Sequence, residues 1–200
     1  MTVLPQQPAP QFTAPAVMPD DTIQGDFSLH DSDGKYRILF FYPFDFSFVC
    51  PTELLALNES VDAFRERECE IVGISTDSQF SHLAWKRMPV EEGGIGPVSF
   101  PLVSDLEKKI SRDYGVLAGD SVAFRATFLL DRSGMVRHLS VNDMDTGRNI
   151  DEILRTLDAV RRFDETGKFC PANWDSEKRA TGGRELRGIV KNVQTFDLGG

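Results

Sequence analysis

Short apolar runs alternate along the chain with longer segments in which apolar and polar positions recur at helical spacing. Residues 38–41 and 71–74 are continuous apolar runs, which predict buried strands. In the longer segments, apolar residues fall three or four positions apart, so that they share one face of a helix. The helices are predicted at residues 52–67, 78–87, 106–114 and 150–163.

Turn signals between apolar runs predict two hairpins. The first joins residues 27–29 to residues 36–41 across Asp-Ser-Asp-Gly at 31–34, and the second joins residues 124–130 to 135–141. Strands that alternate with helices indicate a layered α/β domain, in an order that suits a thioredoxin-like fold.

Both ends of the chain differ from this pattern. Residues 1–19 are rich in Pro, Gln and Ala, which predicts an extended arm with one edge strand near Phe12. The sequence after Gly167 shows no periodicity and predicts an irregular arm. We therefore expect one domain at residues 1–166, including an N-terminal extension, and a C-terminal arm at 167–200.

Composition narrows the classes of partner. A chain of 200 residues with 40% hydrophobic content and a net charge of −9 favours one acidic domain, and nucleic acid or an anionic membrane would call for a basic patch instead. No apolar run approaches the roughly 20 residues that span a bilayer, and no signal peptide opens the chain. We expect a cytoplasmic protein. Its three histidines show no ligand spacing, so neither a metal nor another cofactor is predicted.

Cys50 lies where the apolar run at 38–41 gives way to the helix predicted at 52–67. Pro43 breaks the strand, and Pro51 suits the first helical position, where no backbone N–H is needed. A sulfur at the helix cap lies beside unpaired N–H groups and the positive end of the helix dipole, which favour thiolate over thiol. A lone cysteine in an apolar run is also commonly structural, and position alone does not separate the two.

The residues around Cys50 resemble those of a known family. Pro43, Ser47 and Cys50 form the pattern Pro-x-x-x-Ser-x-x-Cys, which is similar to the sequence around the peroxidatic cysteine of peroxiredoxins. Residues 48–53, Phe-Val-Cys-Pro-Thr-Glu, resemble the typical two-cysteine subgroup that includes the bacterial alkyl hydroperoxide reductases. Further segments match that subgroup in order, so that the resemblance covers roughly residues 10 to 175; they are residues 77–85, 93–97, 124–128 and 169–174.

The resemblance implies a thioredoxin-like fold and a peroxidase that reduces hydrogen peroxide and organic hydroperoxides. Such chemistry needs a nucleophile, donors that hold the peroxide, and positive charge at the leaving oxygen. Cys50 is the expected nucleophile, the Ser47 hydroxyl can hold a peroxide oxygen, and Pro43 can exclude water. Arg125 opens an apolar strand run, and the family motif pairs this arginine with thiolate and peroxide.

The remaining site residues follow from the resemblance alone. Glu53 and Arg148 are expected to orient the arginine, although a solvated charge explains either residue equally well. Cys170 is the expected resolving cysteine, in a disulfide between the subunits of a head-to-tail homodimer that assembles into a decamer. The spacing of Cys50 and Cys170 does not itself separate an intersubunit from an intrasubunit bond. Thioredoxin or a flavoprotein disulfide reductase would recycle it, and Cys69 is expected to be a bystander.

Two other functions compete with this one. A thiol–disulfide oxidoreductase normally has a second cysteine near the helix-capping one, and residues 51–53 contain none. A function as a holdase or redox-relay protein stays open, because sequence does not measure turnover.

Family members that peroxide inactivates easily combine a Gly-Gly-Leu-Gly loop with a C-terminal helix that carries Tyr-Phe. Here residues 93–96 keep such a loop, but the tail at 194–200 lacks Tyr-Phe, so we expect resistance to overoxidation.

Overall fold

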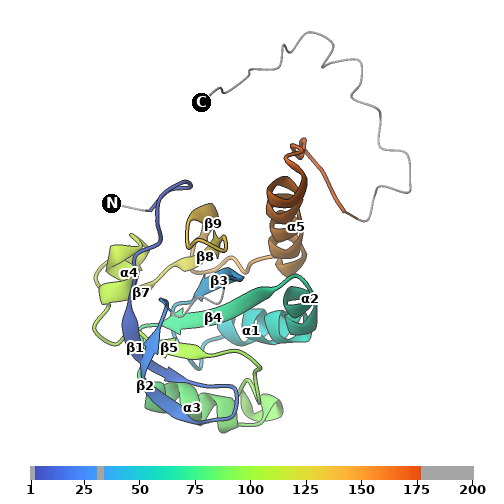
Figure 1. Ribbon diagram of the computed structural model, residues 1–200. Helices are drawn as coiled ribbons and strands as arrows, with labels where there is room; N and C mark the ends of the chain where they lie inside the picture. Colours follow the sequence, from blue (N-terminus) through green and yellow to red (C-terminus); the bar gives the residue numbers. More distant parts are fainter. Residues whose placement is uncertain (1–2, 31–33, 177–200) are drawn as a thin grey trace. The chain divides into compact units, whose positions relative to one another are not determined.

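The computed structural model describes residues 3–30 and 34–176, and Figure 1 shows its elements. The chain divides into two compact units, residues 1–157 and 158–200. Among the described residues, the first unit holds a seven-stranded sheet in the order β2-β1-β5-β4-β3-β8-β9 and a small ladder, β6-β7. The strands are β1 (Thr13–Val17), β2 (Ile23–Ser28), β3 (Tyr36–Phe41), β4 (Cys69–Ser75), β5 (Leu102–Ser104), β6 (Leu117–Ala118), β7 (Val122–Ala123), β8 (Arg125–Leu130) and β9 (Val136–Asn142).

The helices join these strands, which confirms an α/β architecture. The apolar periodicity correctly predicted α3, with Ser78 as its N-cap, and α5. The helices are α1 (Cys50–Glu59), α2 (Val61–Glu66), α3 (Gln79–Arg87), α4 (Lys109–Asp113) and α5 (Ile150–Thr166), with a 3-10 turn η1 (Val90–Glu92).

β3 lies inside the sheet, and all six of its residues are buried. It pairs in parallel with β4 and antiparallel with β8. Leu39 and Phe41 join a core cluster with Ile110 and Tyr114 of the α4 region. Because side chains alternate along a strand, Phe40 points to the opposite face, where the guanidinium of Arg148 lies 3.3 Å from its ring centroid. A strand covered on both faces explains the continuous apolar run at 38–41.

The first predicted hairpin is wrong. β2 pairs with β1, whereas β3 pairs with β4 and β8, so residues 27–29 and 36–41 lie in different parts of the sheet. The burial of β3 on both faces favours the sheet interior, and the polar, half-exposed β2 is suited to the edge. The strand expected near Phe12 exists as β1, but it lies between β2 and β5 and is not an edge strand. The second hairpin is confirmed as β8 and β9.

The helix predicted over residues 52–67 is divided at Ser60. Its backbone leaves the helical region at φ −95° and ψ 1°, and its hydroxyl donates to the Ala56 carbonyl at 3.1 Å. This local bond competes with helix continuation, as serine side chains commonly do. α4 begins three residues later than the pattern indicated, and β5, only three residues long, had too short a pattern to be predicted.

The second unit contains α5 from Asp158 onward and a segment without regular structure at residues 167–176. The rings of Phe163 and Phe169 lie 5.5 Å apart, and Arg162 lies 5.6 Å from the ring centroid of Trp174. The irregular arm expected after Gly167 agrees with this part, whereas residues 177–200 lie outside the described residues. A domain boundary at 166/167 stays a prediction. In the described ranges, no helix is long and apolar enough to cross a bilayer.

Candidate active site

Cys50 is the first residue of α1, and its side chain is fully buried. The first helical bond of α1 runs from Glu53 N to Val49 O at 3.3 Å, so the preceding amides have no partner within the helix. Pro51 takes the second helical position, one residue later than the sequence suggested. The sulfur therefore lies at the amino end of α1, beside the positive end of the helix dipole.

Arg125 contacts this sulfur directly. Its Nη1 donates to Cys50 Sγ at 3.2 Å and to Glu53 Oε2 at 2.9 Å, and its Nε donates to the Met144 carbonyl at 2.8 Å. The antiparallel pairing of β3 with β8 explains the placement, because it puts the first residue of β8 beside the carboxyl end of β3. The arginine is 3% exposed, so its charge acts on the sulfur with little screening by water.

Glu53 and Arg148 complete a buried network. Arg148 donates to Glu53 Oε1 from its backbone N and from Nε, at 2.8 and 2.9 Å, and to Oε2 from Nη2 at 3.0 Å. Their side chains are 2% and 3% exposed, which rules out the solvated surface charge considered for each. Burial disfavours the ionised carboxyl, but the hydrogen bonds and charge of Arg148, with Arg125, outweigh it and hold the pKa of Glu53 below its usual value. Burial lowers the pKa of Arg148.

Pro43 and Ser47 lie on the loop between β3 and α1. Pro43 is buried, which suits the covering role expected of it. The Ser47 hydroxyl oxygen is also buried, and it makes no hydrogen bond to any residue that the structure describes. Buried hydroxyls are normally satisfied, so this oxygen is available to a ligand.

Sequence reasoning missed the residues that hold this loop. The backbone N of Asp45 donates to Asp77 Oδ2 at 2.8 Å, and its Oδ1 accepts from the Tyr42 hydroxyl at 2.9 Å. His82 Nδ1 lies 2.8 Å from Asp45 Oδ2. Burial, and then the charge of Asp45, raise the pKa of Asp77. The sequence contained one signal for these contacts. Asp45 is a carboxylate between two phenylalanines, a setting that suggests burial and therefore a need for hydrogen-bond partners.

Phe46 follows in a left-handed backbone conformation, with φ 55°. Such a conformation is uncommon for a bulky residue, and it is held here by packing of its ring 5.8 Å from the ring of Trp85. Trp85 is fully buried and donates from Nε1 to the Gly93 carbonyl at 2.9 Å. These contacts give Trp85 a packing role under the loop that leads to Cys50.

All three cysteines are free thiols. Cys69 pairs with Tyr36 at the amino end of β3, whereas Cys50 follows the carboxyl end. The six residues of β3 span roughly 17 Å, which separates Cys69 from the site. Cys170 belongs to the second unit, where its thiol donates to the Ala159 carbonyl at 3.6 Å.

Comparison with known proteins identifies the family. A model of the AhpC/TSA family matches residues 5–139. The chain belongs to this family of peroxiredoxins. It is 48% identical over 169 residues to Peroxiredoxin-1 of Gallus gallus, covering 84% of each chain, and 50% identical over 167 residues to Alkyl hydroperoxide reductase C of Helicobacter pylori, covering 83% of this chain and 84% of that relative.

Solved structures agree with the sequence comparison. The reduced 2-Cys peroxiredoxin of Plasmodium vivax superposes on this peroxiredoxin with a TM-score of 0.85 and 47% identity, covering 89% of this chain and 91% of that one. The thioredoxin-like fold predicted from the sequence is therefore confirmed.

Proposed function

We propose that the chain is a thiol-dependent peroxidase that reduces hydrogen peroxide and organic hydroperoxides at Cys50. The Cys50 thiolate attacks one peroxide oxygen and the O–O bond breaks, which gives a sulfenic acid and an alkoxide or hydroxide that takes up a proton. Sulfur is thereby oxidised by two electrons and the peroxide is reduced by two. Arg125 acts in the step that forms the sulfenic acid, because its positive charge stabilises the thiolate and the developing oxyanion.

One observation carries this proposal: Arg125 Nη1 lies 3.2 Å from the Cys50 sulfur in a buried site at a helix amino terminus. A structural cysteine would have no need of a buried guanidinium. The Ser47 hydroxyl adds support, since an unpartnered donor and acceptor on the same loop fits a group that holds the peroxide. Glu53 and Arg148 are positioning residues, because Glu53 accepts a hydrogen bond from Arg125 and Arg148 holds Glu53 in place.

Coupled turnover tests the activity. Hydrogen peroxide and an organic hydroperoxide should each drive steady NADPH consumption when thioredoxin and thioredoxin reductase, or a flavoprotein disulfide reductase, supply electrons. Cys50→Ser should abolish consumption, and Cys69→Ser is the matched control that should retain it. Absence of turnover with every reductant would favour the holdase or relay function instead.

We further propose that Cys170 of a second copy resolves the sulfenic acid. Its thiolate attacks the Cys50 sulfur, a disulfide forms and water leaves, and an external dithiol then reduces the bond. The lack of a second thiol near Cys50 in the described part of the first unit, apart from the distant Cys69, supports a resolving group from outside it. Peroxide should convert the protein to a covalent dimer on non-reducing gels, and Cys170→Ser should remove that dimer. A dimer bridged through Cys69 would contradict the pairing.

We propose that the chain forms a homodimer and that the dimers assemble into a decamer, because large apolar side chains and a strand edge are exposed on its surface. Phe48 and Phe80 are 98% and 66% exposed, and monomeric proteins rarely leave such large apolar side chains in water. Within the described sheet β9 is an edge strand, and exposed edges favour pairing with another chain. Sedimentation of the reduced protein measures its oligomeric state, and a monomer at micromolar concentration would contradict the proposed assembly.

We also propose a cytoplasmic location, because the three cysteines are thiols and not disulfides. Cell fractionation would test this location.

A further inference from the structure

The chain turns sharply after β9, and the backbone of this turn reaches the active site. The Thr146 amide donates to the Asp143 carbonyl at 3.2 Å, which closes a four-residue turn. Inside the turn, the Met144 carbonyl accepts from Arg125 Nε at 2.8 Å. The guanidinium is planar and rigid, so a bond at Nε sets the direction in which Nη1 meets the Cys50 sulfur.

The residues that follow the turn contact Glu53, which also holds Arg125. The Arg148 amide donates to Glu53 Oε1 at 2.8 Å. A Cβ at Gly147 would lie 3.5 Å from Val49 Cγ1 and 3.9 Å from Glu53 Cγ, so this backbone lies next to the start of α1. A shift of the turn would therefore disturb two groups that fix the arginine: the carbonyl inside the turn and the Glu53 carboxylate.

Asn142, the last residue of β9, ties this turn to the sheet. Its Nδ2 donates to the Thr146 carbonyl at 3.1 Å and to the Gly147 carbonyl at 3.4 Å. Both partners are acceptors, so the NH2 end of the amide faces them. Asn142 is also the cross-strand partner of Arg125, and side chains of directly opposed residues lie on one face of a sheet. Its amide and the guanidinium therefore lie on the same face.

Little else holds the turn in the part of the chain that the structure describes. Residues 145–147 are exposed, so burial contributes little to their position. The side chains of Asp143 and Thr146 form hydrogen bonds with adjacent residues inside the turn, which do not join it to the strand. The side chain of Asn142 makes that connection.

We propose that Asn142 is a positioning residue for the peroxidase: its amide holds the turn so that the Met144 carbonyl keeps Arg125 aligned with the Cys50 sulfur. This role rests on the peroxidase function proposed above. Asn142 bonds to the turn and acts through the arginine, whose charge must be in place when the O–O bond breaks. Loss of the amide lets the carbonyl shift, and the contact between Nη1 and the sulfur loses its alignment.

Single-turnover oxidation of the reduced full chain by hydrogen peroxide tests this role. Asn142→Ala should lower the second-order rate constant of Cys50 oxidation about threefold to tenfold, the range for one hydrogen bond. Asn142→Asp keeps the size of the side chain but has no N–H donor when ionised, so it should lose at least as much. Retention of the parent rate constant by either variant overturns the proposal.

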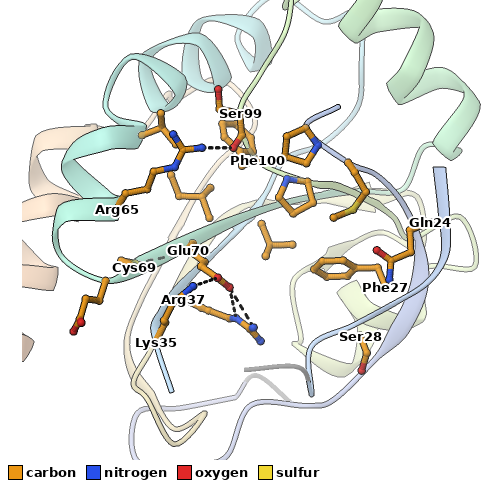
Figure 2. A pocket seen from close by; sticks show the side chains of 17 residues that line it. Gln24, Phe27, Ser28, Lys35, Arg37, Arg65, Cys69, Glu70, Ser99 and Phe100 are labelled. Carbon is orange, nitrogen blue, oxygen red and sulfur yellow. Dashed lines mark hydrogen bonds and ion pairs between the residues drawn. The ribbon is translucent and has the colours of Figure 1, made fainter. Parts of the chain in front are cut away.

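Asn58→Ala is the matched control. Asn58 lies about two turns beyond Cys50 on α1 and also holds a loop, since its Oδ1 accepts from the Ser99 amide at 2.8 Å. Ser99 lines a cavity of about 680 Å³ beside the amino end of β4 (Figure 2). The loop leads to β5, which begins after Pro101 because proline lacks the amide that a longer strand would need. Asn58→Ala should leave the rate constant unchanged; equal losses in Asn58→Ala and Asn142→Ala overturn the proposal.

Alkylation by iodoacetamide tests the alignment without peroxide. The background is Cys69→Ser with Cys170→Ser, in which Cys50 is the only thiol. Asn142→Ala should slow alkylation of Cys50, because a displaced Arg125 stabilises the thiolate less. An equal rate overturns the positioning role, whether or not the parent reacts with peroxide, so failure of this proposal and failure of the peroxidase proposal are distinguishable.

A second background shows whether Asn142 acts through the arginine. Arg125→Lys lacks the Nε donor, so in this background Asn142→Ala should change the peroxide rate constant by less than about twofold, since effects within one hydrogen-bond network are not additive. The same loss in both backgrounds overturns the proposal.

Discussion

Ser47 separates activity from stability in a way that few active-site residues allow. Because its buried hydroxyl has no partner among the described residues, Ser47→Ala removes no bond from the folded protein. Loss of an unpaired buried hydroxyl is neutral or stabilising, so the free energy of unfolding should not fall. The kcat/KM for peroxide should drop about tenfold to a hundredfold, as for loss of a hydrogen bond to a charged group. Ser47→Thr keeps a hydroxyl and should restore most of the activity; equal loss in both variants would contradict the proposed contact.

Glu53 contributes to stability through its charge. Glu53→Gln leaves Arg125 and Arg148 buried without their carboxylate, and should cost about 3–5 kcal/mol of unfolding free energy at neutral pH. The folded pKa of Glu53 lies below its unfolded value, so its contribution is complete above the unfolded value and is lost as pH falls through the folded one. Urea unfolding of the parent and variant should therefore converge in acid. A difference independent of pH would contradict the role of ionisation.

Residue chemistry was predictable where motif and position agreed. Cys50 and Arg125 could be paired through the resemblance to the family motif, whereas position alone did not distinguish a reactive cysteine from a structural one. Burial of Glu53 and Arg148 was not predictable, since a charge on a helix or loop looks the same in sequence whether it faces water or a partner. The contacts of Asp45 depend on Asp77 and His82, which lie more than thirty residues away along the chain.

Among the elements, α3 depends on a side-chain cap whereas α2 does not. Ser78 Oγ accepts from the Ser81 amide at 3.1 Å, but Ser60, the N-cap of α2, makes no side-chain cap bond. Ser78→Ala should therefore cost about 1 kcal/mol of unfolding free energy. Ser60→Ala should cost less and serves as the matched control, measured by urea unfolding. Equal costs would show that the cap bond contributes little.

The helices and strands also show which parts of the fold could be predicted from the hydrophobic pattern of the sequence. The amphipathic α5 was recognisable because it follows the helical period over its whole length, and β3 was recognisable because residues 38–41 form a continuous apolar run. The partners of β2 and β3 were not, because a turn between them predicts a hairpin and carries no information on β1 or β8. β5 depends on three residues and on the missing amide of Pro101, which no window of periodicity resolves.

At the scale of the whole molecule, we expect resistance to overoxidation. The loop at 93–96 is closely packed, since a Cβ at Gly94 would meet the Met88 carbonyl at 1.9 Å. The tail at 194–200, which lacks Tyr-Phe, lies outside the described residues. Without that cover, Cys170 should capture the sulfenic acid before a second peroxide reacts. Mass spectrometry of Cys50 during turnover should show sulfinic acid only at high peroxide; its accumulation at low micromolar peroxide would contradict this.

The segment that carries Cys50 is clamped at both ends. Asp45 is fixed through Asp77, Tyr42 and His82, and Glu53 through two arginines, so only residues 46–52 lie between the fixed points. Unwinding the first turn of α1 changes the rise from about 1.5 to about 3.5 Å per residue, which lengthens the three-residue link from Cys50 to Glu53 by about 6 Å. Hydrogen exchange of the disulfide form should rise at 46–52 and stay slow at 53–57; fast exchange through the whole of α1 would refute the clamp. The clamp thus limits how far the Cys50 sulfur can move. A resolving thiol must come within that distance by its own movement.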